Sequence, residues 1–318
     1  MRRHSVASIL TLVLAAFALP AAAQQFINIL TGGTSGIYYP LGVGLERIYT
    51  KALPGVKITV QATKASVENL NLLQAGRGEV ALTLGDALSQ AWEGNQEAGF
   101  KQSLQNLRGI SAMHSNYVQI VARKDSGIRT LADIKGKRVS VGAPKSGTEL
   151  NARAVFAAAG MKYSDFSKVE YLPYKQSAEL LQNRQIDVTL QSAGLGSPAL
   201  RDLANSVEIV FIPIPHKIIV EIGDKAYQDG VIPADTYKGQ TADVPVARID
   251  NFLVTQKNVS EDTVYRITKA MFDHLDELVA AHASAKSIKL DRAIAGMPIP
   301  LHPGAKKYYL EVGLIKEK

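Results

Sequence analysis

The sequence of 318 residues contains no cysteine, which excludes a disulfide scaffold and leaves no attachment site for a lipid anchor. After the N-terminal region, no stretch reaches 18 uninterrupted apolar residues, so no membrane-spanning helix is predicted there. Glycine (25) and proline (13) are at ordinary levels, and no low-complexity segment occurs. The chain does have 46% hydrophobic residues, with 36 basic and 29 acidic ones, which is typical of a globular protein with a sizeable core.

The first 23 residues have the three parts of a secretory signal peptide. Residues 2–4 form a charged start, residues 6–19 an apolar run, and residues 21–23, all alanine, a cleavage site. The apolar run is shorter than the roughly 20 residues needed to span a bilayer, which favours cleavage after Ala23 over a membrane anchor. We therefore expect an exported protein, and export without a lipid anchor fits the bacterial periplasm.

Short apolar runs alternate with helical patterns along most of the chain. We expect strands at residues 26–30, 56–60, 80–84, 117–122, 138–141, 169–172 and 188–190, with helices between most of them. This alternation predicts an α/β fold in which each lobe has a mostly parallel sheet flanked by helices. In the C-terminal third, one long helix is expected from Ser260, a plausible N-cap, to about Ala283.

The chain also has a weak internal repeat. At an offset of 111, Gly36 aligns with Gly147 and Ser66 with Ser177, and the order of elements repeats. Chance similarity between two α/β stretches is the alternative, since such stretches share this order. We predict a signal peptide at 1–23, lobe 1 from 24–115 plus about 251–318, and lobe 2 from about 116–250. Two extended segments, 109–123 and 243–256, would link the lobes as a hinge.

The loops after the strands are the candidate binding segments, because ligands of doubly wound sheets bind beyond the carboxyl ends of the strands. Residues 31–40 include three glycines within five residues, followed by a helix start that suits an anion. A tight turn explains the same residues equally well. Residues 142–149 have glycines at phosphate-loop spacing, but Thr148-Glu149 replaces the Lys-Ser or Lys-Thr pair, which argues against nucleotide hydrolysis and leaves a carboxylate as a reasonable ligand.

Several polar residues in these loops have two interpretations. Lys64, Lys145 and Lys175 lie in predicted strand-end loops and could neutralise an acidic ligand, although a solvated loop lysine is the commoner case. Ser66 and Asn69 start a predicted helix, and capping is the more ordinary role for such residues.

No catalytic, metal or cofactor arrangement is evident in the sequence. The six histidines lack H-x-x-x-H and H-E-x-x-H spacing, and no G-x-S-x-G elbow occurs. Gly42-x-Gly44 lies within a predicted helix, with Arg47 where a dinucleotide fingerprint needs glycine. The modest positive charge has no accompanying nucleic-acid motif. We expect no enzymatic activity, no cofactor and no nucleic-acid partner.

Six motifs, spread over nearly the whole chain after residue 23, resemble the TAXI family, the solute receptors of tripartite ATP-independent periplasmic (TRAP) transporters. They are Thr-Gly-Gly-Thr-Ser-Gly-Ile-Tyr-Tyr-Pro at 31–40, Ser-Val-Glu-Asn-Leu at 66–70, Asp-Ser-Gly-Ile at 125–128, Leu-Ala-Asp-Ile-Lys-Gly-Lys-Arg-Val at 131–139, Gly-Ala-Pro-Lys-Ser-Gly-Thr-Glu at 142–149 and Met-Pro-Ile-Pro-Leu-His-Pro-Gly at 297–304. The resemblance implies a two-lobed, type II-like periplasmic binding protein. Such a protein captures a small carboxylate or amino acid and delivers it to TRAP membrane subunits driven by an ion gradient. We expect a monomer.

The resemblance also implies positions for the binding residues. It places around the crevice Thr34, Ser35, Tyr38, Ser66, Asn69, Gly147, Thr148 and Glu149, faced by Gln191 and Ser192, with Asp86 at the edge. The predicted ligand-binding set is completed by two residues of the glycine loops and the three loop lysines: Gly36, Ser146, Lys64, Lys145 and Lys175. The family pattern usually has glycine where Ser35, Lys64 and Lys145 stand. Because two of these differences add positive charge, we expect an acid with more than one carboxylate.

Two alternatives to a transport receptor stay open at this point. The same clamp could present its solute to a periplasmic signalling partner, which reconstitution with membrane subunits would distinguish. An exported α/β enzyme is less favoured, and it would be recognised by chemical conversion of the bound solute.

Overall fold

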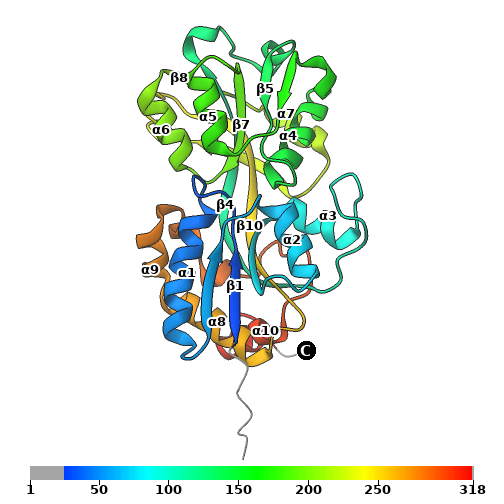
Figure 1. Cartoon of the computed structure of the whole chain (residues 1–318), viewed down its shortest axis with the longest axis vertical. Helices are drawn as coiled ribbons and strands as arrows, with labels where there is room; N and C mark the ends of the chain where they lie inside the picture. The colour runs from blue at the N-terminus through cyan, green and yellow to red at the C-terminus, as the bar shows by residue number, and fades with distance from the viewer. Residues whose placement is uncertain (1–24, 317–318) are drawn as a thin grey trace, which may run out of the picture.

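A computed structural model describes residues 25–316 of the chain. These residues form two lobes, one above the other in Figure 1. The predicted signal peptide lies outside these described residues. The strands are β1 (Phe26–Leu30), β2 (Lys57–Gln61), β3 (Val80–Leu84), β4 (Leu107–Arg123), β5 (Arg138–Ser140), β6 (Lys168–Glu170), β7 (Val188–Ala193), β8 (Ile209–Ile212), β9 (Tyr227–Ile232) and β10 (Val244–Gln256). The helices are α1 (Tyr38–Ala52), α2 (Ser66–Gln74), α3 (Gly85–Glu93), α4 (Gly147–Ala158), α5 (Tyr174–Gln182), α6 (Pro198–Ser206), α7 (His216–Ile222), α8 (Glu261–Asp273), α9 (Leu275–Ala281) and α10 (Pro303–Glu311).

The sheet is mixed, and its strand order is β2-β1-β3-β10-β4-β7-β5-β6. Strand β1 is parallel to β2 and β3, and β5 is parallel to β6 and β7. Each lobe thus contains a parallel triplet, and the predicted α/β fold is confirmed. The two triplets are joined by β10 and β4, which are antiparallel to each other and to their outer neighbours. Strand β3 is buried throughout, as its continuous apolar run predicts for a strand covered on both faces.

Strands β4 and β10 are long enough to pass through both lobes. Their 17 and 13 residues correspond to about 56 and 43 Å at roughly 3.3 Å per residue. In Figure 1 they run between the lower lobe (lobe 1), with β1, α1 to α3 and α8 to α10, and the upper lobe (lobe 2), with β5, β7, β8 and α4 to α7. Their pairing is irregular between Asp250 and Phe252, so the ladder is interrupted near its middle.

Two apolar clusters form the core of the described residues. One lies in lobe 1, where α1, α8 and α10 cover the sheet and include the fully buried Leu45, Tyr49 and Tyr309. The other continues from α2 and α3 across β4 into lobe 2, and it contains Leu84 and Leu150. The second cluster therefore contains residues of both lobes and spans the junction between them.

The long C-terminal helix predicted by the sequence is divided in two. Ser260 caps α8 as expected, accepting a hydrogen bond from the amide of Thr263 at 3.1 Å. At His274 the backbone leaves the helical region, with φ −128° and ψ 37°, before α9 begins. The change of direction lets α9 pack closely on α1 at Gly44. A side chain at this position would have no room, because Leu278 Cδ2 lies 2.9 Å from the virtual Cβ of Gly44. No helix within residues 25–316 has the length and apolar content to cross a bilayer.

Candidate ligand-binding site

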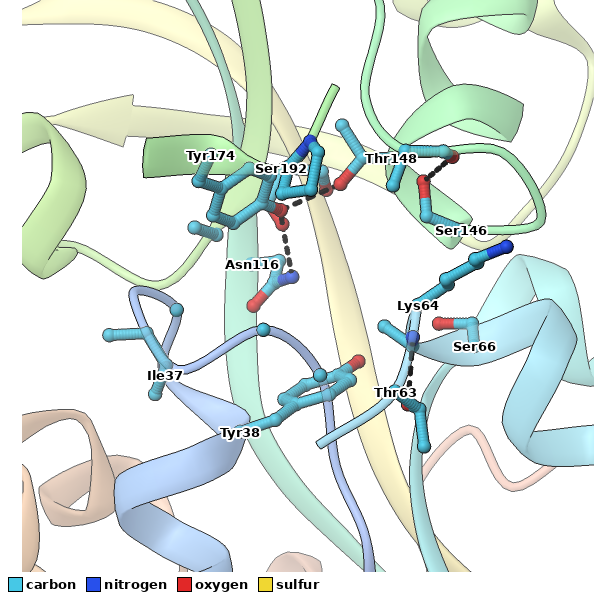
Figure 2. Close-up of a pocket in the computed structure, with 18 of the residues that line it drawn as sticks. Ile37, Tyr38, Thr63, Lys64, Ser66, Asn116, Ser146, Thr148, Tyr174 and Ser192 are labelled. Atoms are coloured by element: carbon cyan, nitrogen blue, oxygen red, sulfur yellow. Dashed lines mark hydrogen bonds between the residues drawn. The ribbon is translucent and has the colours of Figure 1, made fainter. Parts of the chain in front are cut away.

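A cavity of about 120 Å³ lies between the lobes, beside the long strands (Figure 2). This volume has room for several water molecules and hence for a small metabolite. Its lining residues from lobe 1 are Gly32, Gly33, Ser35, Gly36, Ile37, Tyr38, Thr63, Lys64, Ala65, Ser66 and Leu84. Those from β4 and lobe 2 are Asn116, Ala143, Ser146, Gly147, Thr148, Pro173, Tyr174, Ser192 and Ala193.

Most lining residues lie in the loops at the carboxyl ends of strands β1, β2, β5 and β6 and at the starts of the helices that follow them. The others lie on strands β3, β4 and β7: Leu84, Asn116, Ser192 and Ala193. Nine of the predicted binding residues line the cavity: Ser35, Gly36, Tyr38, Lys64, Ser66, Ser146, Gly147, Thr148 and Ser192. The other seven do not line it: Thr34, Asn69, Asp86, Lys145, Glu149, Lys175 and Gln191.

Asn69 supports the cavity from behind and does not face it. Its side-chain amide donates to the carbonyl oxygens of Thr31 at 2.7 Å and Leu82 at 2.8 Å, and its oxygen accepts from the Thr63 hydroxyl at 2.6 Å. The residue is fully buried. Because one side chain ties the end of β1 and the middle of β3 to the loop after β2, its hydrogen-bonding capacity is already used within lobe 1.

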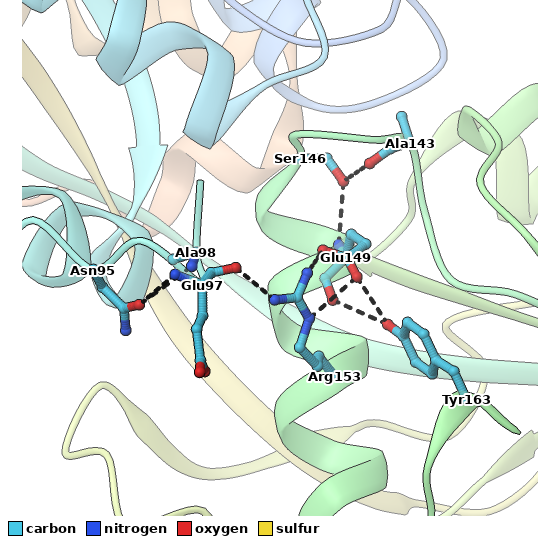
Figure 3. Close-up of polar contacts among 8 residues, drawn as sticks. All are labelled: Asn95, Glu97, Ala98, Ala143, Ser146, Glu149, Arg153 and Tyr163. Carbon is cyan, nitrogen blue, oxygen red and sulfur yellow. Dashed lines mark hydrogen bonds and ion pairs between the residues drawn. The ribbon is translucent and has the colours of Figure 1, made fainter. Parts of the chain in front are cut away.

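Glu149 also points away from the cavity, into a polar cluster of lobe 2 (Figure 3). Its carboxylate lies 2.6 Å from Nη2 of Arg153, and it accepts a hydrogen bond from the Tyr163 hydroxyl at 3.1 Å. Arg153 reaches across to lobe 1 and donates to the carbonyl of Glu97 at 2.6 Å. Glu149 therefore belongs to an ion pair that helps an arginine bridge the two lobes.

Asp86 lies at the start of α3 and forms a second bridge between the lobes. One carboxylate oxygen accepts hydrogen bonds from the Asn151 amide at 2.7 Å and from the Tyr227 hydroxyl at 2.8 Å. Asn151 is on α4 and Tyr227 on β9, so both donors come from the part of the chain that follows β4. Asp86 is fully buried, and burial raises its pKa to about 6.

The other four residues outside the lining are separated from the cavity by local geometry. Thr34 is exposed at the tip of its loop, and Lys145 is exposed with a left-handed φ of 62°. Lys175 is exposed on α5, 3.9 Å from Glu179. Gln191 is buried, with its side chain donating to the Tyr174 carbonyl at 3.3 Å, and it alternates with Ser192 along β7.

Three polar residues that the sequence did not single out line the cavity: Thr63, Asn116 and Tyr174. The internal repeat could have indicated one of them, because Tyr174 occupies the position equivalent to Thr63 at the offset of 111. Asn116 is one of several buried polar residues within the long strand β4, and nothing in the local pattern distinguishes it from the others.

A chain of hydrogen bonds runs along the cavity wall from lobe 1 to lobe 2. The Tyr38 hydroxyl donates to Asn251, whose amide donates to Asn116 Oδ1 at 2.9 Å. Asn116 and the Tyr174 hydroxyl both donate to the Ser192 carbonyl, at 2.7 and 2.5 Å. Burial raises the pKa of Tyr38 well above its usual value and that of Tyr174 to about 12, so both phenols are neutral donors at neutral pH.

The two lobes touch directly around the cavity. A virtual Cβ on Gly147, at the start of α4, would lie 2.6 Å from Leu84 Cδ1 and 2.7 Å from Ser66 Oγ, so the lobes approach closely at this glycine. Next to it, the amide of Glu68 donates to the Lys145 carbonyl at 3.1 Å. On the other side, the amide of Ala199 donates to the Ser35 carbonyl at 3.4 Å. The arrangement is therefore a closed one.

Asp86 predicts a pH dependence of stability. Its pKa in the folded state exceeds its ordinary value of 3.8, so its contribution to the free energy of unfolding is fully present below about pH 4 and is lost as pH rises through about 6. Asp86→Asn keeps an acceptor for Asn151 and Tyr227 and removes the buried charge. At pH 7.5 we expect this variant to be more stable in urea unfolding by up to about 3 kcal/mol, with a smaller difference at pH 4. Equal differences at the two pH values would contradict the assignment.

Similar folds occur among known protein structures. The structure is similar to a periplasmic transporter, with a TM-score of 0.54 and 12% identity, covering 92% of this chain and 94% of that one. It is also similar to a protein from Bordetella bronchiseptica RB50, with a TM-score of 0.53 and 17% identity over 92% and 89% of the two chains. A third similar structure is the binding-protein component of a phosphonate ABC transporter from Pseudomonas aeruginosa. Its TM-score is 0.52 and its identity 14%, over 82% of this chain and 79% of that one. The fold is that of the periplasmic binding proteins.

The sequence itself matches a known family over nearly its whole length. Residues 29–313 match the NMT1-like family, and the chain belongs to this family. The match covers both lobes and all of the cavity lining.

Proposed function

We propose that this protein is a receptor that captures a small organic acid between its lobes and delivers it to the membrane subunits of a transporter. The observation that carries this proposal is the cavity, which is lined by the strand-end loops of both lobes. The lobes touch each other around it, so the arrangement is closed. A ligand that contacts both lobes favours closure, because only the closed arrangement satisfies both sets of contacts at once. The closed shape is then what the membrane subunits recognise.

The proposed hinge lies where the long strands cross between the lobes. Lobe 1 would comprise residues 24–115 and about 251–318, and lobe 2 about 116–250. The two borders between the lobes, at 115/116 and 250/251, fall close to the irregular step in the pairing of β10 with β4. There Asp250 and Phe252 of β10 lie opposite residues 112–115 of β4. A bulge at this place supports the assignment, because an interrupted ladder bends more readily than a regular one.

We propose TRAP membrane subunits as the recipient and the periplasm as the location. The six motifs that resemble TAXI receptors support this recipient, and the signal-peptide pattern of residues 1–23 supports export. An ABC transporter is the second candidate, because one protein of similar fold is a component of such a system. Reconstitution of the receptor with each type of membrane subunit in vesicles would distinguish the two, and uptake through the ABC subunits alone would contradict the TRAP proposal.

Ligand-induced stabilisation tests the receptor function. The protein after removal of residues 1–23 would be screened by thermal shift and calorimetry against hydroxy acids, keto acids, dicarboxylates and amino acids. At about 100 times the dissociation constant, a bound ligand should add about 2.7 kcal/mol to the free energy of unfolding. The recovered ligand should be chemically unchanged. Failure of every acid to stabilise the protein would contradict the proposed function, and conversion of the ligand would indicate an enzyme.

A further inference from the structure

The charges around the cavity restrict the ligand more narrowly than the fold does. Among the described residues that line the cavity, Lys64 is the only charged one. Lys145 and Lys175, the other two lysines of the strand-end loops, are exposed outside the lining. A second carboxylate of a bound ligand would therefore be removed from water without a cationic partner, which is costly.

The cavity also lacks an acidic partner for an ammonium group. Asp86 and Glu149, the two nearby acids predicted to bind the ligand, lie outside the lining. Other side chains engage one carboxylate oxygen of Asp86 and the carboxylate of Glu149. The Ser192 carbonyl, an acceptor in the wall, already receives hydrogen bonds from Asn116 and Tyr174. Two hydrogen bonds use both lone pairs of a carbonyl oxygen, so none is left for a ligand cation.

One buried hydroxyl of the wall lacks a hydrogen-bond partner within residues 25–316. Ser192 is 2% exposed, and its Oγ has no hydrogen-bond partner among the described residues. By contrast, the Ser146 hydroxyl donates to the Ala143 carbonyl at 2.7 Å and accepts from the Glu149 amide at 3.1 Å. A buried hydroxyl without a partner is unfavourable, and a ligand hydroxyl or carbonyl would supply the missing bond.

We propose that the cavity selects a small acid with one negative charge and an uncharged hydroxyl or keto group, and discriminates against dicarboxylates and α-amino acids. This inference rests on the proposed receptor function. Lys64 and the amino end of α4 at Gly147 hold the carboxylate, and Ser192 binds the uncharged group. Apolar lining residues such as Ile37, Leu84 and Pro173 contact the carbon chain. The expectation of a polyacid, drawn from the sequence, is replaced by this assignment, because the three lysines do not converge on the cavity.

Two series of matched acids test the selectivity by calorimetry. The four-carbon series is 2-hydroxybutyrate, 2-oxobutyrate, butyrate, succinate and 2-aminobutyrate; the six-carbon series consists of the corresponding derivatives of hexanoate. In at least one series, the hydroxy or keto acid should bind at least tenfold more tightly than the dicarboxylate and the amino acid. Preference for a dicarboxylate or an amino acid would overturn the selectivity and leave the receptor function intact. Absence of binding by these acids and by the wider panel of the preceding subsection would overturn both.

Substitutions separate the two proposed contacts. Lys64→Gln should lower affinity for the preferred acid at least tenfold and reduce its salt dependence, whereas Lys145→Gln and Lys175→Gln, the matched controls, should change it less than twofold. Ser192→Ala should lower the affinity for the hydroxy acid toward that of the unsubstituted acid and leave the latter unchanged. A loss that is equal for both acids, or equal effects of the three lysine variants, would overturn the assignment of these contacts.

Discussion

Gly147→Val is expected to weaken binding of the preferred acid at least 100-fold, which corresponds to about 2.7 kcal/mol. At Gly147 the lobes approach closely beside the cavity, and a Cβ there would lie within 2.7 Å of both Leu84 and Ser66. Such contacts do not occur between real atoms, so the lobes could not reach the closed arrangement with a valine at this position. Calorimetry with the acid identified by the panel measures the effect.

The control for this variant is Gly33→Ala. Gly33 also lines the cavity, but its virtual Cβ has no neighbour within 4 Å, so affinity should change less than about threefold. The melting temperature of the ligand-free Gly147→Val protein should stay close to that of the natural protein, because an open arrangement gives the new side chain room. Normal affinity in Gly147→Val would show that closure at this contact is not needed for binding.

Asn69→Ala is expected to lower the free energy of unfolding by about 3 kcal/mol. The substitution removes hydrogen bonds to the Thr31 and Leu82 carbonyls and to the Thr63 hydroxyl, and it leaves these groups in a fully buried place. Each buried polar group left without a partner costs about 1–3 kcal/mol, partly offset where another bond persists. Urea unfolding followed by circular dichroism measures the change.

Asn71→Ala, two residues further along α2, is the matched control. Its side chain makes one hydrogen bond, to the Val67 carbonyl of its own helix at 2.8 Å, and it is partly buried. We expect a loss below about 1 kcal/mol. Similar losses for both variants would contradict the role of Asn69 as the tie between β1, β3 and the loop after β2.

The sequence predicted the elements whose patterns are local. Strands β1 and β3 occupy the predicted residues, because each is a short apolar run bounded by polar or glycine-containing turns. Ser260 caps its helix as expected. The break at His274 was not predicted, because the apolar spacing continues through it and the change of direction comes from packing of α9 on α1 at Gly44.

The candidate site was predictable only in part, for a related reason. Glycine loops and strand ends are visible in the sequence, and nine predicted residues do line the cavity. Which way a polar side chain points depends on partners that are distant in sequence. Glu149 turns toward Tyr163, and Asp86 binds Tyr227, 141 residues away. Asn116 reaches the wall because β4 crosses between the lobes, a path that no local pattern indicates.

The paired strands β4 and β10 also determine how the lobes can move. Hydrogen bonds connect the two strands on both sides of the irregular step at Asp250, so one lobe cannot slide past the other without breaking a ladder. A two-stranded ribbon of this kind yields to bending far more easily than to shear. The lobes should consequently move apart by bending of the ribbon, and the opening should be widest at the rim opposite the ribbon. The solute would enter and leave by that rim alone.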